Sequence, residues 1–152
     1  MQSHIKPIIA AALALALTGC ASMQRAASYS SDGQMTFDGR LTVDGRVMSL
    51  SIHPQDDTLL VQRGIGDSAA AGALQGITFG LARGWKPDPR KIDAALASFL
   101  QPAGCTTSPS YEMGATDTSY EARFSCPAGV DLRVLMANQR DALRRGEPLR
   151  LD

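Results

Sequence analysis

Side chains able to act as a nucleophile or general base are few in this chain. Its 152 residues contain two histidines, His4 and His53. His53 precedes Pro54, and the carboxylates of Asp56 and Asp57 lie just beyond it. Adjacent carboxylates diverge along a chain, whereas a glycosidase needs two carboxyl groups that face each other across a cleft. We therefore expect His53 to be a surface histidine, and we predict no catalytic residue.

Two glycine-rich motifs surround Ser68. Gly64-x-Gly66-x-x-Ala69 lies between a predicted strand and a predicted helix, where a dinucleotide-binding fingerprint would stand, but no alternating strand–helix units surround it. Gly66-Asp67-Ser68 is similar to the nucleophile block of the GDSL-type esterases, but those enzymes need a histidine near the C-terminus, and none is present there. We interpret the first motif as a turn and Ser68 as a helix cap, and we expect no cofactor.

Cys20 closes a short apolar segment near the N-terminus. A weakly basic start leads into ten uncharged apolar residues, 8–17. This run is too short to span a bilayer as a helix, but it is typical of a signal peptide. The residues that end it, Leu17-Thr18-Gly19-Cys20, resemble the lipobox of bacterial lipoproteins.

The lipobox resemblance has three consequences for the chain. It implies that residues 1–19 are removed and that Cys20 is acylated as the mature N-terminus. It also implies an outer-membrane location facing the periplasm, because Ala21 stands where this class uses Asp for retention at the inner membrane. The membrane is then a partner through the lipid anchor.

Two cysteines, Cys105 and Cys126, follow Cys20 in the sequence. An even pair in an oxidising compartment predicts one disulfide. The alternative is two buried thiols or half of a metal site. A metal would need more ligands, and His53 is the only histidine beyond the leader. We therefore predict the disulfide and no metal.

Length and charge restrict the class of protein. Without residues 1–19 the chain retains enough residues for one domain with a core. Its charge is near neutral, so it lacks the positive excess that nucleic-acid binding requires. Residues 21–34 are small, polar and without periodicity, which indicates a flexible tether with an average reach of about 20 Å. Together with Cys20, which the lipobox resemblance implies is lipidated, they form the segment 20–34. Residues 35–152 are predicted to form a single domain.

Asp44-Gly45 predicts a two-residue hairpin turn, because both positions of a type I′ turn need positive φ. The resulting register places Leu41 opposite Met48 and Gly39 opposite Leu50. Apolar side chains then gather on one face and polar side chains on the other, as expected of a half-buried antiparallel pair. The predicted polar face contains Thr36, Asp38, Arg40, Thr42, Ser49, Ser51 and His53.

Gly39 interrupts the first of these strands. A second turn at Asp38-Gly39 would leave a strand of only four residues, so we expect a bulge at Gly39 instead. Residues 54–57 predict another turn, and residues 58–63 predict a third strand.

Residues 68–83 predict a helix with an unusual stripe of small residues. Gly72, Gly76 and Gly80 recur at every fourth position, and each costs a helix about 1 kcal/mol relative to Ala. Close packing of this helix on the sheet would offset the cost. The alternatives are a packing interface with the bilayer or another subunit, as in GxxxG contacts, or a segment that is partly a loop.

Two further helices are predicted. Asp88-Pro89 is a typical helix start, with Asp as the cap and Pro at the first helical position. Residues 131–145 contain good helix formers and no Gly or Pro, and Gly146 follows them. The alternation of apolar residues over 130–136 would also suit a strand, but we favour the helix.

The second hairpin is predicted from the cysteines. If Cys105 faces Cys126, then Thr107 faces Phe124 and Tyr111 faces Tyr120. Glu112, Glu121 and Arg123 would then lie on the opposite, polar face. A turn-rich stretch at 114–117 supplies the loop.

These elements predict an α+β fold. An antiparallel sheet from two hairpins and one further strand would carry two central helices and a C-terminal helix, stapled by one disulfide. We expect a non-catalytic, lipid-anchored envelope lipoprotein that is an accessory or binding component of an outer-membrane or periplasmic assembly. Its protein partner in the envelope is unknown. The alternative is a small periplasmic hydrolase or hydrolase inhibitor.

Overall fold

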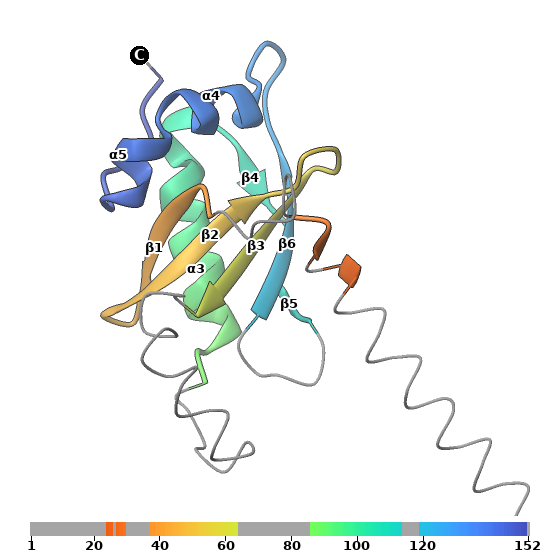
Figure 1. Ribbon diagram of the computed structural model, residues 1–152, viewed down its shortest axis with the longest axis vertical. Coiled ribbons are helices and arrows are strands. Elements are labelled where there is room, and N and C mark those ends of the chain that lie inside the picture. The colour runs from red at the N-terminus through yellow and green to blue at the C-terminus, as the bar shows by residue number, and fades with distance from the viewer. Residues whose placement is uncertain (1–23, 26, 30–36, 64–85, 114–118, 152) are drawn as a thin grey trace, which may run out of the picture.

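The protein is an antiparallel sheet that curls around helices on one of its faces, and this confirms the predicted α+β class (Figure 1). The computed structural model describes residues 24–25, 27–29, 37–63, 86–113 and 119–151. The strand order is β1-β2-β3-β6-β4, with β5 also paired to β6. The strands are β1 (Gly39–Val43), β2 (Arg46–Ile52), β3 (Thr58–Arg63), β4 (Thr106–Thr107), β5 (Tyr111–Glu112) and β6 (Ser119–Ser125). The helices are α3 (Pro89–Leu100), η1 (Gln101–Ala103), α4 (Leu132–Asn138) and α5 (Arg140–Arg144).

The first hairpin has the predicted turn and register. Asp44 and Gly45 adopt φ values of 53° and 73°, as a type I′ turn requires. Leu41 pairs with Met48 and Gly39 with Leu50 across the two strands. The turn dipeptide therefore determines which side chains of β1 and β2 point into the core.

The predicted bulge at Gly39 is wrong. Gly39 pairs with Leu50 in an unbroken ladder. A Cβ atom at Gly39 would lie 3.1 Å from the Cβ atom of Leu143 on α5, which is closer than most such contacts. Glycine suits this position because α5 lies against the backbone of β1, and a side chain here would require Leu143 to shift.

The main core lies between the sheet and the helices. Helix α3 begins as predicted, with the Asp88 carboxylate accepting a hydrogen bond from the Arg90 amide. Its apolar stripe faces strands β1 and β4, and α5 packs on β1. The residues at this interface that are no more than 2% exposed include Val43, Met48, Leu50, Leu59, Val61, Ile92, Leu96, Leu100, Tyr120, Ala122, Leu132, Met136 and Leu143.

The C-terminal helix is present and is divided in two. Asp131 caps α4 by accepting hydrogen bonds from the amides of Arg133 and Val134. The strand alternative for residues 130–136 is thereby excluded. Gln139, at φ −108° and ψ 11°, separates α4 from α5. The Gln139 side-chain oxygen accepts a bond from the Arg150 amide at 2.9 Å, so it holds the C-terminal tail.

The second hairpin follows the prediction only near the disulfide. Cys105 and Cys126 are bonded, and Thr107 pairs with Phe124 as expected. Further along, Tyr111 pairs with Glu121 rather than with Tyr120. The strand that contains β4 and β5 therefore has one extra residue relative to β6. The break coincides with Pro109, which has no N–H to donate.

The register shift has a cause in the helix layer. The Ser110 amide donates a 2.8 Å hydrogen bond to the Asp93 carboxylate of α3 instead of to β6. Tyr111 is consequently moved to the sheet face that carries no helix. This change places its hydroxyl beside Glu121.

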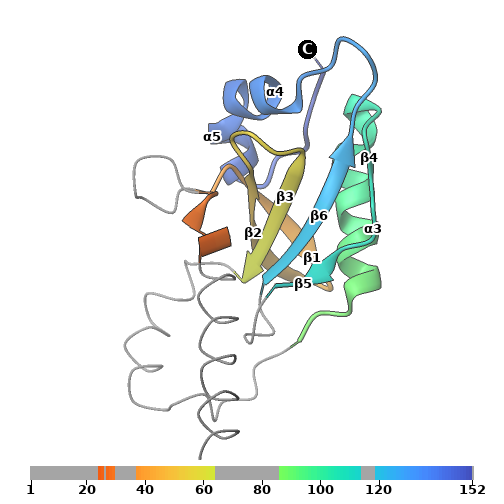
Figure 2. The same ribbon diagram turned by 90° about the vertical axis from the view of Figure 1, so that its right-hand side faces the viewer.

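The helix-free face of the sheet is covered in part. Figure 2 shows residues 24–25 and 27–29, hereafter the N-terminal segment, on the side of the sheet opposite α3. Tyr29 forms a second buried cluster there with Leu60 and Met113. The predicted polar face is not solvated in the second half of β2, because Ser49, Ser51 and, just after the strand, His53 are at most 8% exposed.

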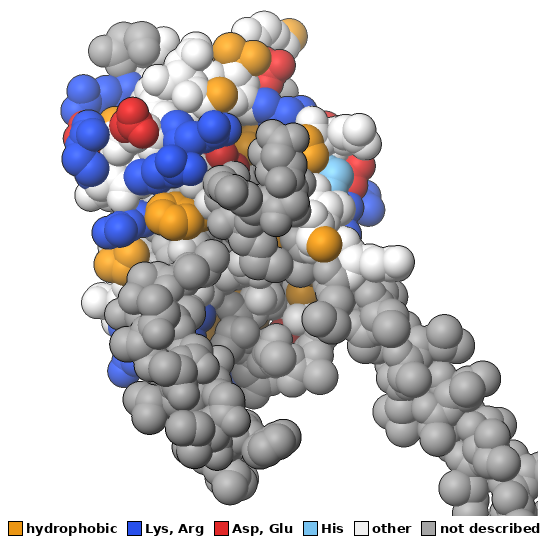
Figure 3. Space-filling view, in the orientation of Figure 1, with side chains coloured by type: hydrophobic (Ala, Val, Ile, Leu, Met, Phe, Trp, Pro, Cys, Tyr) orange, Lys and Arg blue, Asp and Glu red, His pale blue; other side chains and the backbone are white. Residues whose placement is uncertain are grey.

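The charged side chains are distributed unevenly. Figure 3 shows Lys and Arg side chains gathered on the side of the molecule formed by α5 and β1. Two arginines of α5 bond to the segment before β1: Arg140 pairs with Asp38 at 3.1 Å, and Arg144 donates to the Phe37 carbonyl at 2.8 Å. No helix among the described residues is long and apolar enough to span a membrane.

Candidate functional site

A buried carboxylate, Glu121, is the centre of the most unusual cluster in the described residues. It lies on β6 and is 1% exposed. A charged group at such depth must be paired and hydrogen-bonded to be tolerated. Its partners come from the N-terminal segment and from β5.

Both oxygens of Glu121 are used. Arg25 donates to Oε1 through Nε at 2.8 Å and through Nη2 at 2.5 Å. The Tyr29 hydroxyl donates to the same oxygen, and the Tyr111 hydroxyl donates to Oε2. Arg25 Nη2 also donates to Thr58 Oγ1 at 3.0 Å. The carboxylate is thus held in its charged form by one guanidinium and two phenols.

These contacts change the acidity of the cluster. Burial alone would raise the pKa of Glu121, but the hydrogen bonds from Arg25, Tyr111 and Tyr29 outweigh it and the pKa is lowered. Burial raises the pKa of Tyr29 and of Tyr111, and the bonds to Glu121 raise both further. At neutral pH the carboxylate is therefore ionised and both phenols keep their protons.

His53 lies beside this cluster and is not the surface histidine that the sequence indicated. It is 5% exposed, and its ring meets the Tyr29 ring edge-on at 4.9 Å between centroids. The N-terminal segment covers it, which no signal near His53 in the sequence revealed. Burial is the main reason that the pKa of His53 is lowered, so the ring is neutral at pH 7.

Ser28, His53 and Asp56 are arranged like a catalytic triad. Ser28 Oγ lies 3.0 Å from His53 Nε2, and Asp56 Oδ2 lies 3.5 Å from His53 Nδ1. In a working triad, Nδ1 donates its proton to the carboxylate and Nε2 accepts the serine proton. The hydrogen bonds around the ring decide whether that tautomer is present here.

The ring holds the opposite tautomer. His53 Nδ1 accepts hydrogen bonds from the amides of Asp56 at 2.8 Å and Gln55 at 3.2 Å, so it carries no proton. The proton of the neutral ring is then on Nε2, which donates to Ser28 Oγ at 3.0 Å and so accepts no bond from Arg25 Nη1, which lies further away at 3.4 Å. The Ser28 hydroxyl in turn donates to the Arg25 carbonyl at 2.6 Å. This arrangement fastens the N-terminal segment to the β2–β3 turn and leaves no base for Ser28.

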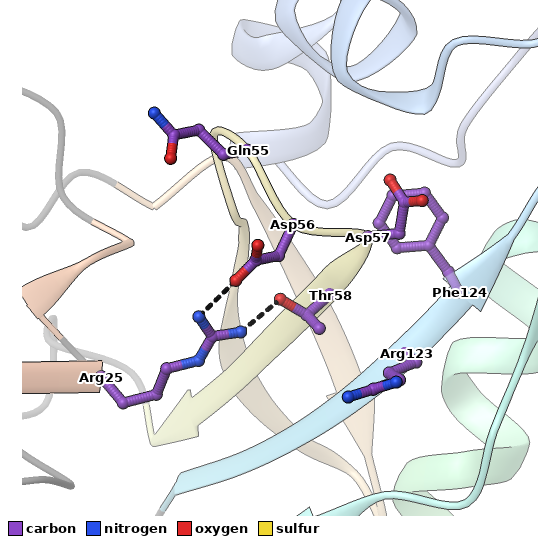
Figure 4. Close-up of a pocket in the computed structure, with 7 residues that line it drawn as sticks. All are labelled: Arg25, Gln55, Asp56, Asp57, Thr58, Arg123 and Phe124. Atoms are coloured by element: carbon purple, nitrogen blue, oxygen red, sulfur yellow. Dashed lines mark hydrogen bonds and ion pairs between the residues drawn. The ribbon is translucent and has the colours of Figure 1, made fainter.

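A polar groove lies next to the cluster. It encloses about 580 Å³ and is open to solvent, and Figure 4 shows Arg25 pointing between Asp56 and Thr58 at its wall. Asp56 accepts from Arg25 at 2.5 Å, and Asp57 accepts from Arg133 at 2.8 Å. The lining residues are Arg25, Gln55, Asp56, Asp57, Thr58, Arg123 and Phe124. Asp56 and Asp57 therefore reach the groove, whereas His53 does not line it.

Of the sequence-predicted site residues, the structure describes the two cysteines of the disulfide. The Cys105–Cys126 disulfide lies just beyond Ser125, where β6 ends. Tyr111 pairs with Glu121, near the start of β6. Cys20, Ser68 and the glycines Gly72, Gly76 and Gly80 lie outside the described residues. No group of three or more His, Cys, Asp or Glu side chains in the described part of the chain could hold a metal ion.

The sequence does not predict this cluster. It predicts a flexible tether for the N-terminal segment and a polar sheet face for Glu121. One signal was available: Arg25 and Tyr29 are four residues apart, which would place them on one side of a helical turn. Their partner, 96 residues from Arg25, carries no matching signal. No family model, curated protein or solved structure matches this chain.

Proposed function

We propose that this chain is a non-catalytic, lipid-anchored lipoprotein of the bacterial envelope. It would serve as an accessory or binding component of an outer-membrane or periplasmic assembly. The observation that carries the proposal is the apolar leader that ends in Leu17-Thr18-Gly19-Cys20, which resembles a lipobox. The Cys105–Cys126 disulfide supports it, since such bonds persist in oxidising compartments.

The state of His53 supports the non-catalytic part of the proposal. A Ser–His–Asp hydrolase needs a histidine that accepts a proton from serine, and here two backbone amides hold Nδ1 as the acceptor instead. Burial also disfavours the imidazolium that such a reaction would form. The cluster then uses its polar groups to attach the N-terminal segment.

Membrane attachment is tested by Cys20→Ala. Each buried CH₂ of a lipid chain contributes about 0.8 kcal/mol, so two or more chains anchor a protein firmly. The variant should move from the membrane to the soluble fraction or accumulate unprocessed, whereas the control Ser22→Ala should stay membrane-bound. Mass spectrometry that finds an unmodified Cys20 in membrane-bound protein would overturn the anchor. Density-gradient fractionation then tests the outer-membrane location.

The proposal that the protein is non-catalytic is tested by asking whether Ser28 is an activated nucleophile. A fluorophosphonate probe labels activated serines, and we expect no labelling of the native protein. Labelling that disappears in Ser28→Ala would favour the hydrolase alternative. A binding role predicts that the lipidated protein, purified from detergent-solubilised membranes after cross-linking, carries a stoichiometric envelope protein.

A further inference from the structure

The N-terminal segment is attached to the domain within a few residues of the proposed lipid site. Arg25 is the first described residue along the chain that contacts Glu121, and the Tyr29 ring packs against Leu60 and Met113. Tyr29 is 6% exposed, which is unusual for a residue in a tether. The chain between the bilayer and the domain therefore ends at Arg25 and not at residue 37.

The remaining chain is short compared with the domain. Cys20 and Arg25 are five residue steps apart in sequence, which span at most about 18 Å when fully extended. A domain of this length has a radius of gyration of about 13 Å and hence a diameter well above that reach. A body held on so short a chain cannot turn its opposite side to the bilayer.

We propose that the N-terminal segment is a latch that holds the domain against the lipid headgroups, with the helix-free sheet face and its polar groove towards the membrane. Helix α3, on the other side of the sheet, then faces away from the bilayer (Figure 2). The inference rests on the proposed lipid anchor at Cys20. The surface that meets the headgroups is polar and of mixed charge, so the contact is apposition and not insertion.

Release of the N-terminal segment from the sheet would lengthen the chain between the lipid anchor and the domain. With Arg25 and Tyr29 released, the chain from Cys20 to residue 37 would span at most about 60 Å. The domain could then rotate freely, and both of its sides would sample the same average distance from the bilayer. Orientation is thus the property that separates a docked latch from a flexible tether.

Two single-cysteine reporters measure this orientation. Gln55→Cys lies on the exposed β2–β3 turn at the groove, and Ser98→Cys lies on the exposed side of α3. The other cysteines are lipidated or in the disulfide, so a thiol-reactive donor dye labels one position only. The full-length lipidated protein is placed in phosphatidylethanolamine–phosphatidylglycerol vesicles that contain acceptor-labelled lipid. We expect higher energy transfer from the Gln55→Cys reporter than from the Ser98→Cys reporter.

Latch variants show whether the cluster causes the orientation. Arg25→Ala combined with Tyr29→Ala should abolish the difference between the two reporters. Arg90→Ala, an exposed arginine at the start of α3, is the matched control and should preserve the difference. Intact lipid on Cys20 is confirmed by mass spectrometry in every sample.

Each outcome decides the proposal. Equal transfer from both reporters in the lipidated native sequence would overturn the latch and leave the lipoprotein assignment standing. A difference that persists in the Arg25→Ala, Tyr29→Ala variant would show that the segment does not set the orientation. An unlipidated Cys20 would overturn both proposals together.

Discussion

Replacing the buried carboxylate by an amide of the same shape, Glu121→Gln, should lower stability strongly. In the native cluster the carboxylate accepts two bonds from Arg25 and one each from Tyr29 and Tyr111. The glutamine oxygen can replace Oε1, but the amide nitrogen must face the Tyr111 hydroxyl as a donor. The substitution thus removes the negative charge while it preserves the volume.

The expected loss of stability in Glu121→Gln follows from the replacement of charged hydrogen bonds by neutral ones. Hydrogen bonds to charged groups contribute about 1.5–3 kcal/mol, and those between neutral groups about 0.5–1.5 kcal/mol. A loss of roughly 1 kcal/mol at each of Arg25, Tyr29 and Tyr111 gives a cost of about 3 kcal/mol. Arg25 keeps about a third of its side chain in water, so it can rehydrate and the cost does not rise further. In a domain of this size the Tm should fall by about 10 °C.

Glu112→Gln is the matched control. Glu112 lies on β5 and pairs at 2.8 Å with Lys86 at the surface, where an ion pair contributes less than about 1 kcal/mol. Both variants are made in the mature chain with Cys20→Ser and unfolded in urea at pH 7. A cost for Glu121→Gln no greater than that for Glu112→Gln would refute the stabilising role of the buried charge, because the network would then contribute nothing beyond an ordinary surface pair.

Four further measurements test the protonation of Glu121 and His53, the disulfide, and the packing of α5 on β1. The pKa of Glu121 lies below its ordinary value of 4.5, so its stabilisation is complete above that value and is lost as the pH falls through the folded pKa. The stability difference between native protein and Glu121→Gln should therefore shrink in acid, and an undiminished difference below pH 4 would contradict this. His53 should titrate by NMR below pH 6.5, with its neutral proton on Nε2; a proton on Nδ1 would revive the triad. Replacing both Cys105 and Cys126 by Ser removes the link across a 21-residue separation and should cost roughly 3 kcal/mol in thermal unfolding; an unchanged Tm would show that the disulfide does not stabilise the fold. Gly39→Val should cost about 1–3 kcal/mol by overpacking α5; a neutral result would mean that the helix moves away without penalty.

Sequence by itself determined the elements whose causes are local. Asp44-Gly45 determined the register of the first hairpin, because few dipeptides suit two successive positive φ values. Asp88-Pro89 and Asp131 determined where two helices begin, because a cap bonds amides only two or three residues away. The disulfide was predicted from the even number of cysteines and the compartment that the lipobox resemblance implies.

Only the tertiary structure decided the site. A hydrogen bond from Ser110 to Asp93 of α3 shifts the second hairpin by one residue, and this carries Tyr111 to the face of Glu121. Period-2 alternation places Glu121 on a polar face, but it does not say whether another segment covers that face. Arg25 and Tyr29 cover it from more than 90 residues away in the chain. Burial of a charge depends on partners that are distant in sequence, and so the polar face of the sheet could be recognised as an attachment site only after the chain had folded.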